Sequence, residues 1–184
     1  MKFLKWFGII ILSLVIIYLI GPRPSSPKIN PDLPVITSDL LLLEQDIKNS
    51  EANVKDIKPD NYARIIWSNP EKKEKTTYSV VYLHGFSASY AEGAPINLDF
   101  AKRYGCNLYL SRLEEHGISN THVFENLTPE ALLLSAKRAL AIGKKLGDKV
   151  ILICTSTGGT LGLYLAAHHS EVDALILYFL AYLK

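Results

Sequence analysis

The fold of this chain is decided by the stretch VILICTSTGG, residues 150–159. Its first four residues form an unbroken apolar run, which is typical of a central parallel strand covered by helices on both faces. The run leads through Cys154 to Ser156 and then into a segment rich in glycine and leucine. Such a strand-to-helix turn holds a serine in a strained conformation with its hydroxyl projecting, while Gly158 and Gly159 let the strand and the helix approach closely. A plain βα loop is the competing interpretation, because Cys154 stands where this turn usually has glycine.

The rest of the chain alternates between β-rich segments and segments with helical periodicity. That alternation is typical of a βαβ sheet, so the expected fold class is α/β. We expect strands at 63–67, 78–83, 107–110, 149–154 and 174–179, and helices at 95–104, 129–146 and 159–169.

Two of the expected helices carry capping signals. Thr128 and Pro129 suit the cap and the first position of the helix 129–146. The apolar face of that helix holds Leu132, Ala136, Ala139, Leu140 and Gly143, and Lys137 lies elsewhere on it. Ser38 is expected to cap a shorter helix that follows it directly.

A second group of residues with chemical interest follows the apolar run 80–83. The sequence His84-Gly85-Phe86 opens a loop there, and Ser156 follows the neighbouring strand, so both groups sit at the carboxyl ends of adjacent strands. A lone histidine at a strand end is more often a hydrogen-bonded structural residue than a base, so we give His84 no role in proton transfer. Phe86 is either part of an acyl pocket or a core aromatic residue, and the sequence leaves both interpretations open.

Three motifs together resemble the α/β-hydrolases, and in particular their carboxylesterase and monoglyceride-lipase branch. They are His84-Gly85-Phe86, the stretch RLEEHG at residues 112–117 and the turn TSTGG at residues 155–159, and the resemblance extends from about residue 60 to residue 178. It implies the α/β-hydrolase fold, a mostly parallel sheet with helices on both faces. It also implies a serine hydrolase that acts on small acyl esters or lipid-like monoacylglycerols, with no metal and no organic cofactor.

The resemblance assigns roles to individual residues. Ser156 would be the nucleophile, and the backbone N–H groups of Phe86 and Thr157 would form the oxyanion hole. His116 would be a loop or pocket histidine outside the catalytic triad, with Glu115 standing where the family's loop has glycine. Pocket or loop support would come from His84, Gly85 and His116, and the turn itself would be built by Cys154, Gly158 and Gly159.

The chain also departs from the family. Family members place the triad acid after the seventh strand and the triad histidine after the eighth. This chain is expected to end just past the sixth, so the C-terminal strands, both triad partners and the lid would be missing. His168 and His169 lie about three turns along the helix that Ser156 introduces, and Asp173 precedes the next strand. We therefore expect a truncated, catalytically incomplete chain, and the alternative is a non-catalytic, membrane-tethered remnant of a hydrolase.

The N-terminal residues have the pattern of a membrane anchor. Lys2 and Lys5 precede an uncharged apolar run at 6–20, and no Ala-x-Ala cleavage site follows it. We expect an uncleaved signal-anchor helix with its lysines in the cytoplasm and the rest of the chain on the extracytoplasmic side. The chain would then consist of an anchor at 1–21, an extended, poorly packed proline-rich linker at 22–37 and an incomplete α/β-hydrolase domain at 38–184.

Composition excludes several other functions. The chain has 184 residues and a formal net charge of +2, and its lysines form no basic face for nucleic acid. Cys106 and Cys154 lack the paired spacing of a zinc or redox site. The glycines after Ser156 do not fit the G-x-G-x-x-G pattern of a dinucleotide site. Cys154 lies within the expected strand, where burial disfavours a reactive thiolate.

Overall fold

The computed structural model describes residues 2–21, 23 and 27–178, with the side chain of Lys2 left out. These residues form one five-stranded sheet with the order β1-β3-β2-β4-β5, in which β1 is antiparallel to β3 and the other neighbours are parallel. The strands are β1 (Arg64–Ile66), β2 (Thr76–Leu83), β3 (Asn107–Leu110), β4 (Gly147–Thr155) and β5 (Val172–Tyr178).

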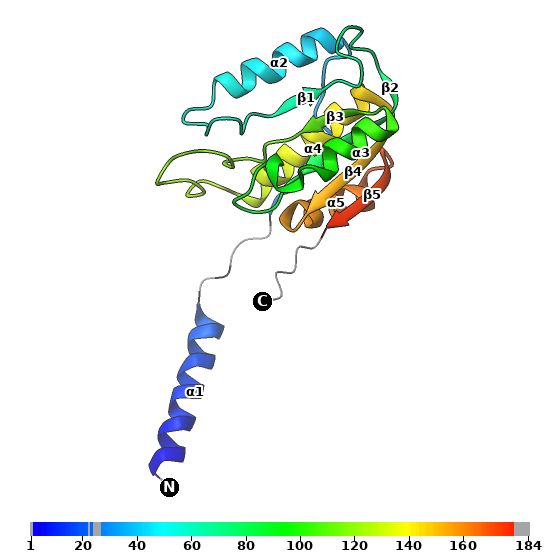
Figure 1. Ribbon diagram of the computed structural model, residues 1–184. Coiled ribbons are helices and arrows are strands. Elements are labelled where there is room, and N and C mark those ends of the chain that lie inside the picture. The colour runs from blue at the N-terminus through cyan, green and yellow to red at the C-terminus, as the bar shows by residue number, and fades with distance from the viewer. Residues whose placement is uncertain (1, 22, 24–26, 179–184) are drawn as a thin grey trace.

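Five α-helices and one short 3₁₀ helix accompany the sheet (Figure 1). They are α1 (Lys2–Ile20), α2 (Leu40–Ala52), the 3₁₀ helix η1 (Tyr90–Gly93), α3 (Ile96–Tyr104), α4 (Pro129–Leu146) and α5 (Thr157–His168). The α/β class and the mostly parallel sheet predicted from the sequence are confirmed.

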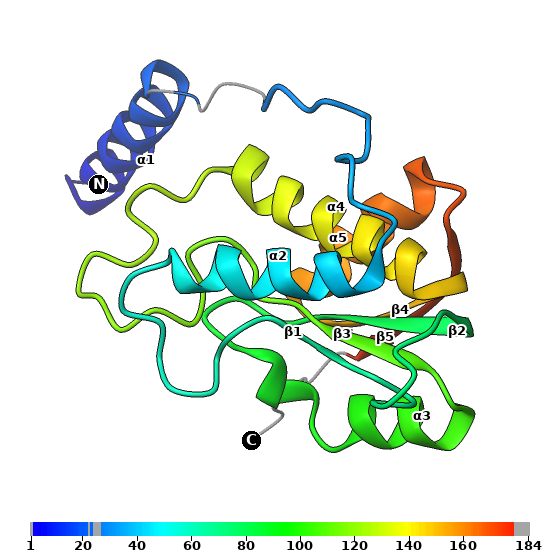
Figure 2. The same cartoon turned by 90° about the horizontal axis from the view of Figure 1, so that it is seen from above.

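Helices cover both faces of the sheet, with α2, α4 and α5 on one side and α3 on the other (Figure 2). The alternating side chains of β2 explain why. Val81 and Leu83 are fully buried in the core that contains α4 and α5, whereas Val80 and Tyr82 are fully buried in the smaller core under α3. A strand that is buried on both faces reads as a continuous apolar run, which is how β2 and β4 appear in the sequence.

The five strands expected from the sequence are all present in the described sheet, with ends that differ by at most two residues. Residues 27–39, which precede α2, contain no strand. The last expected strand, 174–179, is found as β5 up to Tyr178, and residue 179 lies outside the described residues.

The cap predicted for α2 was wrong by one residue. Asp39 is the N-cap, because its backbone is extended (φ −77°, ψ 118°) and its carboxylate accepts hydrogen bonds from the N–H groups of Leu41 and Leu42 at 2.9 and 3.0 Å. Ser38 instead accepts a hydrogen bond from the ammonium group of Lys145 at 2.9 Å.

The cap of α4 follows the prediction. Thr128 Oγ1 accepts from the N–H of Ala131 at 3.1 Å, and Pro129 occupies the first helical turn. Lys137, which lies off the predicted apolar face of α4, is nevertheless only 2% exposed. Its ammonium group can be buried since backbone carbonyl groups of the segment before α2 accept its hydrogen bonds.

The segment before α2 is packed against the domain, contrary to the expectation from the sequence. Residues 28–36, here called the strap, were expected to be poorly packed but lie against α4. Leu33 and Ile36 pack on the main core, which gives the strap apolar contacts with the domain. Pro22 and residues 24–26 of the predicted linker lie outside the described residues.

The N-terminal helix α1 does not contribute to the core. Its stretch Phe3–Ile20 is exposed along its whole length and is long and apolar enough to cross a membrane. A signal sequence has the same length and composition, so membrane attachment belongs with the proposals below.

Candidate active site

Ser156 lies between the last residue of β4 and the first residue of α5. Its backbone has φ 47° and ψ −114°, a conformation that residues other than glycine rarely adopt. The side chain is exposed, and the carbonyl group of Ser156 already accepts the first hydrogen bond of α5, from Thr160 at 3.1 Å. The strand-turn-helix context that the sequence predicted is therefore present, with a strained serine at its apex.

The glycines after Ser156 explain how the turn fits against its neighbours. A Cβ atom at Gly158 would overlap the carbonyl oxygen of Leu83 and come within 2.7 Å of that of His84. One turn later, a Cβ atom at Gly162 would lie 2.6 Å from the sulfur of Cys154. Only glycine allows α5 to start this close to the end of β2.

Cys154, the residue that replaces the usual glycine, is completely buried. Burial raises the pKa of its thiol to about 12. The thiol therefore stays protonated at neutral pH and serves as a small apolar side chain between β4 and α5.

The two groups of residues singled out in the sequence meet at one edge of the sheet. Leu83 at the end of β2 pairs with Cys154 at the end of β4. As a result, a Cβ atom at Gly85 would lie 3.4 Å from the Cβ atom of Ser156. The loop that starts with His84 and Gly85 is thus in contact distance of the serine, and the side chain of Phe86 is 55% exposed beside it.

His84 fixes the base of this loop. Its side chain is fully buried, with Nδ1 2.9 Å from the carbonyl oxygen of Gly85 and Nε2 accepting a hydrogen bond from the N–H of Leu113 at 3.1 Å. Nδ1 therefore carries the proton. Burial lowers the pKa of His84 to about 4, which keeps the ring neutral at pH 7.

His116 belongs to a cluster of rings next to the loop. The ring of His116 lies 5.0 Å from that of His84, 5.5 Å from that of Phe86 and 4.8 Å from that of Phe124, measured between centroids. Its Nδ1 atom is 2.7 Å from the carbonyl oxygen of Glu114, whereas Nε2 has no hydrogen-bond partner in the described part of the chain. Burial is the main cause that lowers the pKa of His116.

Phe124 was missed in the sequence. It lies 4.7 Å from Phe86 between ring centroids, although nothing in its irregular loop distinguishes it from other aromatic residues. Next to it is a cavity of about 200 Å³, which Ser87, Ser89 and Gly117 also line. An aromatic wall and a small cavity thus adjoin the loop that contacts Ser156.

A polar network under the loop was also missed. The carboxylate of Glu92 accepts from the N–H of Gly85 at 2.7 Å and from the hydroxyl of Tyr82 at 3.3 Å. That hydroxyl lies 3.0 Å from Thr155 Oγ1, next to the serine, and its pKa is raised mainly by burial. The N–H of Gly85 is occupied in this way, while that of Phe86 has no acceptor among the described residues. The spacing Ser89-x-x-Glu92 at the start of η1 is the only sequence signal that could have pointed to Glu92.

The remaining histidines lie away from the serine. His168 is at the far end of α5, where its Nδ1 atom is 2.8 Å from the carbonyl oxygen of Tyr164, and His169 follows it. His122 forms an exposed pair with Glu125. In the part of the chain that the structure describes, no imidazole is hydrogen-bonded to Ser156, and no three His, Cys, Asp or Glu side chains are grouped as a metal site.

Comparisons with known proteins find similarity at the level of structure. No family model matches the sequence, and no curated protein matches it. Among solved structures, a chain from the metagenome-derived lipolytic enzymes LipS and LipT superposes with a TM-score of 0.56 at 18% identity, covering 66% of this chain and 46% of that one. At this identity, the likeness shows a shared fold.

Two esterases superpose less closely. An esterase from a marine microorganism has a TM-score of 0.45 at 24% identity, with 63% of this chain and 40% of that chain covered. An esterase of Pyrococcus furiosus has a TM-score of 0.45 at 13% identity, with 83% and 56% covered. The chain thus spans between 40% and 56% of the lengths of these three proteins.

Proposed function

We propose that this chain, which has the α/β-hydrolase fold, supplies the nucleophile of a membrane-anchored serine hydrolase that cleaves acyl esters. The observation that carries the proposal is the conformation of Ser156, a non-glycine residue at φ 47° whose side chain is exposed at the carboxyl edge of a parallel sheet. Strain of this kind costs about 1–3 kcal/mol and is concentrated at functional sites. The lipolytic neighbour with the same fold supports ester bonds as the substrate class.

In the proposed reaction, Ser156 Oγ attacks the carbonyl carbon of the ester while its proton passes to a general base. The carbonyl oxygen becomes an oxyanion, which the N–H groups of Phe86 and Thr157 would stabilise. Thr157 is the first residue of α5, so its N–H has no partner within the helix and lies at the positive end of the helix dipole. Collapse of the tetrahedral intermediate breaks the bond to the alcohol oxygen, which takes the proton from the base, and leaves the acyl group on Ser156 Oγ. Water, deprotonated by the base, then hydrolyses this acyl group and releases the acid.

The proposal places the general base and its acid partner outside the described residues. His84 holds hydrogen bonds at both ring nitrogens, and its pKa is too low for it to accept the serine proton efficiently at neutral pH. His116 is buried and faces Phe86 and Phe124. A C-terminal segment of the kind found in α/β-hydrolases would complete the site.

The anchor is part of the same proposal. We infer that α1 spans the membrane with Lys5 in the cytoplasm and the hydrolase domain on the extracytoplasmic side. Protease added to intact spheroplasts is then expected to degrade the domain. Full protection of the domain under these conditions would contradict this orientation.

The second candidate is an inert, membrane-tethered remnant. It is favoured by the observation that no imidazole is hydrogen-bonded to Ser156 in the described part of the chain. The two candidates differ in the effect of adding a C-terminal hydrolase segment, because only an enzyme gains activity.

The experiment compares the 184-residue chain with an extended chain, in which the C-terminal segment of a related α/β-hydrolase is joined to it. Both are assayed on a short-chain nitrophenyl ester, each also as Ser156→Ala and, as a matched control, as Ser170→Ala in the turn after α5. We expect little turnover by the 184-residue chain and turnover by the extended chain that Ser156→Ala alone abolishes. No turnover by a folded extended chain would favour the inert remnant.

A further inference from the structure

The strap runs along α4 from one end of the helix to the other. At its start, the N–H of Lys28 donates to the carboxylate of Glu130, in the first turn of α4, at 3.0 Å. Just after its end, Ser38 accepts from Lys145, in the last turn of α4, at 2.9 Å. The strap therefore has a fixed direction relative to this helix.

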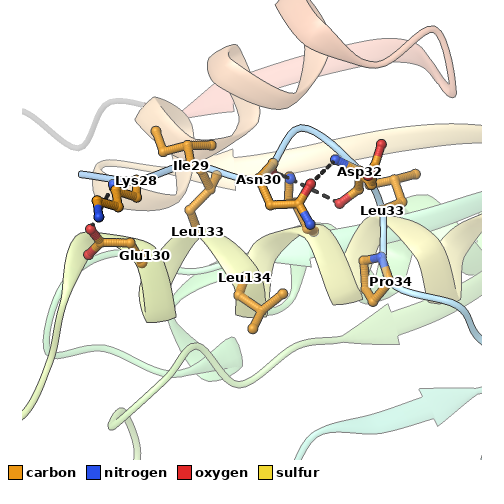
Figure 3. A pocket seen from close by; sticks show the side chains of 10 residues that line it. Lys28, Ile29, Asn30, Asp32, Leu33, Pro34, Glu130, Leu133 and Leu134 are labelled. Atoms are coloured by element: carbon orange, nitrogen blue, oxygen red, sulfur yellow. Dashed lines mark hydrogen bonds between the residues drawn. The ribbon is translucent and has the colours of Figure 1, made fainter. Parts of the chain in front are cut away.

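Lys137 holds the middle of the strap. Its buried ammonium group donates to the backbone carbonyl groups of Asn30 and Asp32, and the latter bond is 3.0 Å long. A charge that is 2% exposed needs such partners, because an unpaired buried ammonium costs several kcal/mol. Figure 3 shows Lys28 beside Glu130 and Leu33 and Pro34 farther along the helix, around a cavity of about 380 Å³.

The direction of α4 places the start of the strap at the Ser156 edge of the sheet. Helix α4 ends at Leu146 and β4 begins at Gly147, so the helix packs antiparallel to the strand. The first turn of α4 thus lies at the carboxyl end of β4, where Ser156 is. The strap begins at Lys28, which is hydrogen-bonded to Glu130 in that first turn. The chain from α1 therefore reaches the domain at the same edge.

The connection between α1 and the strap is short. Helix α1 ends at Ile20 and Gly21 closes its last turn, and apart from Arg23 the described chain resumes at Pro27. Six peptide units separate Gly21 from Pro27, and an extended chain spans at most about 22 Å over that number of residues. If α1 ends at the membrane surface, the start of the strap is held within about 22 Å of that surface, and the Ser156 edge lies on the same side of the domain.

We propose that the edge of the sheet that carries Ser156 faces the membrane in which α1 is anchored, so that the site takes its acyl esters from the lipid bilayer. The proposal rests on the anchoring of α1 given above. The exposed ring of Phe86 at this edge is apolar, and Phe is among the residues that bury into a membrane surface. The turn at Lys72, between β1 and β2, is at the opposite edge and would face away from the bilayer.

The test measures which edge is near the lipid. Single cysteines at Ser87, in the loop after β2, and at Lys72 are spin-labelled in the full chain, with no polyhistidine tag, in vesicles that contain a nickel-chelating lipid. Both positions are exposed, and the native cysteines are buried. Paramagnetic relaxation by nickel falls steeply with distance, so we expect it to be several-fold stronger for the label at 87 than for the label at 72.

A lengthened connection provides the control. Inserting about twelve glycine and serine residues directly before Pro27 makes the connection long and flexible enough for the domain to turn over, so the difference between the labels should vanish. The same insertion at Lys73, one residue after the labelled position 72, leaves the connection to α1 as it is. It should therefore leave the difference in relaxation between the labels at 87 and 72 unchanged.

Three results would overturn the inference. Equal relaxation at the two positions, or stronger relaxation at 72, would show that the Ser156 edge does not face the lipid, while the anchor stands. A difference that survives the insertion before Pro27 would show that the short connection is not its cause. Failure of the chain to associate with vesicles at all would overturn the proposed anchor and, with it, this inference.

Discussion

Ser156 has an unfavourable backbone conformation, and the residues around it maintain that conformation. Holding φ at 47° costs about 1–3 kcal/mol, which the packing of β4 and α5 must supply. Gly158 is central to this packing, because its missing side chain leaves room for the carbonyl oxygen of Leu83. A Cβ atom at Gly159, one residue later, would lie 3.4 Å from a methyl carbon of Leu177, which is an ordinary van der Waals contact.

The difference between the two glycines predicts different effects of alanine on stability. Gly158→Ala should lower the free energy of unfolding by about 3 kcal/mol, because α5 must move away from β2 to admit the new methyl group. Gly159→Ala is the matched control, and it should leave stability unchanged or raise it by up to about 1 kcal/mol, since alanine favours helix. Urea unfolding at pH 7 measures both. Equal effects of the two substitutions would contradict the close approach of the turn to β2.

The lowered pKa of His84 predicts how the stability of the chain depends on pH. Its pKa is about 4 in the folded chain against 6.5 for an ordinary histidine, so between these values the unfolded chain binds more protons. The contribution of His84 to stability is therefore complete above pH 6.5 and is lost as the pH falls toward 4, by about 3 kcal/mol at 1.36 kcal/mol per pKa unit.

Urea unfolding between pH 7 and pH 4 checks this. The variant His84→Gln should show a shallower loss of stability with falling pH than the unmodified chain. His122→Gln, at an exposed position, should show the same loss as the unmodified chain. A loss unaffected by His84→Gln would mean that other groups are responsible for it.

At the scale of elements, the cap of α2 offers a direct comparison between sequence and structure. Asp39→Ala removes the acceptor for two N–H groups of the first turn and should cost about 1 kcal/mol. Ser38→Ala removes only an exposed hydrogen bond to Lys145 and should change stability by less than about 0.5 kcal/mol. Thermal unfolding of the two variants, followed by circular dichroism, distinguishes them. A larger effect at Ser38 would restore the cap that the sequence first suggested.

The elements that the sequence predicted best are those whose pattern is unambiguous. The strands β2 and β4 are continuous apolar runs because both of their faces are buried. The start of α4 is marked by local sequence alone, with Thr128 as the cap and Pro129 as the first helical residue. At α2 the signal was ambiguous, because Ser38 and Asp39 are both good caps, and only the hydrogen bonds that Asp39 accepts in the folded chain decide between them.

Features that depend on contacts distant in sequence could not be predicted. In the sequence, Lys137 lies off the apolar face of an amphipathic helix, and its partners Asn30 and Asp32 lie more than a hundred residues away. Phe124 joins Phe86 through an irregular loop. Glu92 reaches Gly85 because η1 folds the chain back, which no periodic pattern reveals.

At the scale of the whole molecule, the chain combines an apolar N-terminal helix, a strap and a sheet whose carboxyl edge carries the candidate nucleophile. It spans 46% of the length of the lipolytic protein with the same fold, so ester hydrolysis is proposed here as the activity of a longer assembly of elements. The short connection between α1 and the strap links two of the proposals, since it would set which edge of the sheet meets the membrane.

The central claim, that Ser156 is a catalytic nucleophile, is tested most directly by covalent labelling. The extended chain is treated with a fluorophosphonate, whose fluoride an activated serine displaces, and the modified peptide is located by mass spectrometry. The account predicts one adduct, on the peptide that contains Ser156, and its loss in Ser156→Ala but not in Ser170→Ala. A folded extended chain that forms no adduct, or one whose adduct persists in Ser156→Ala, would contradict it.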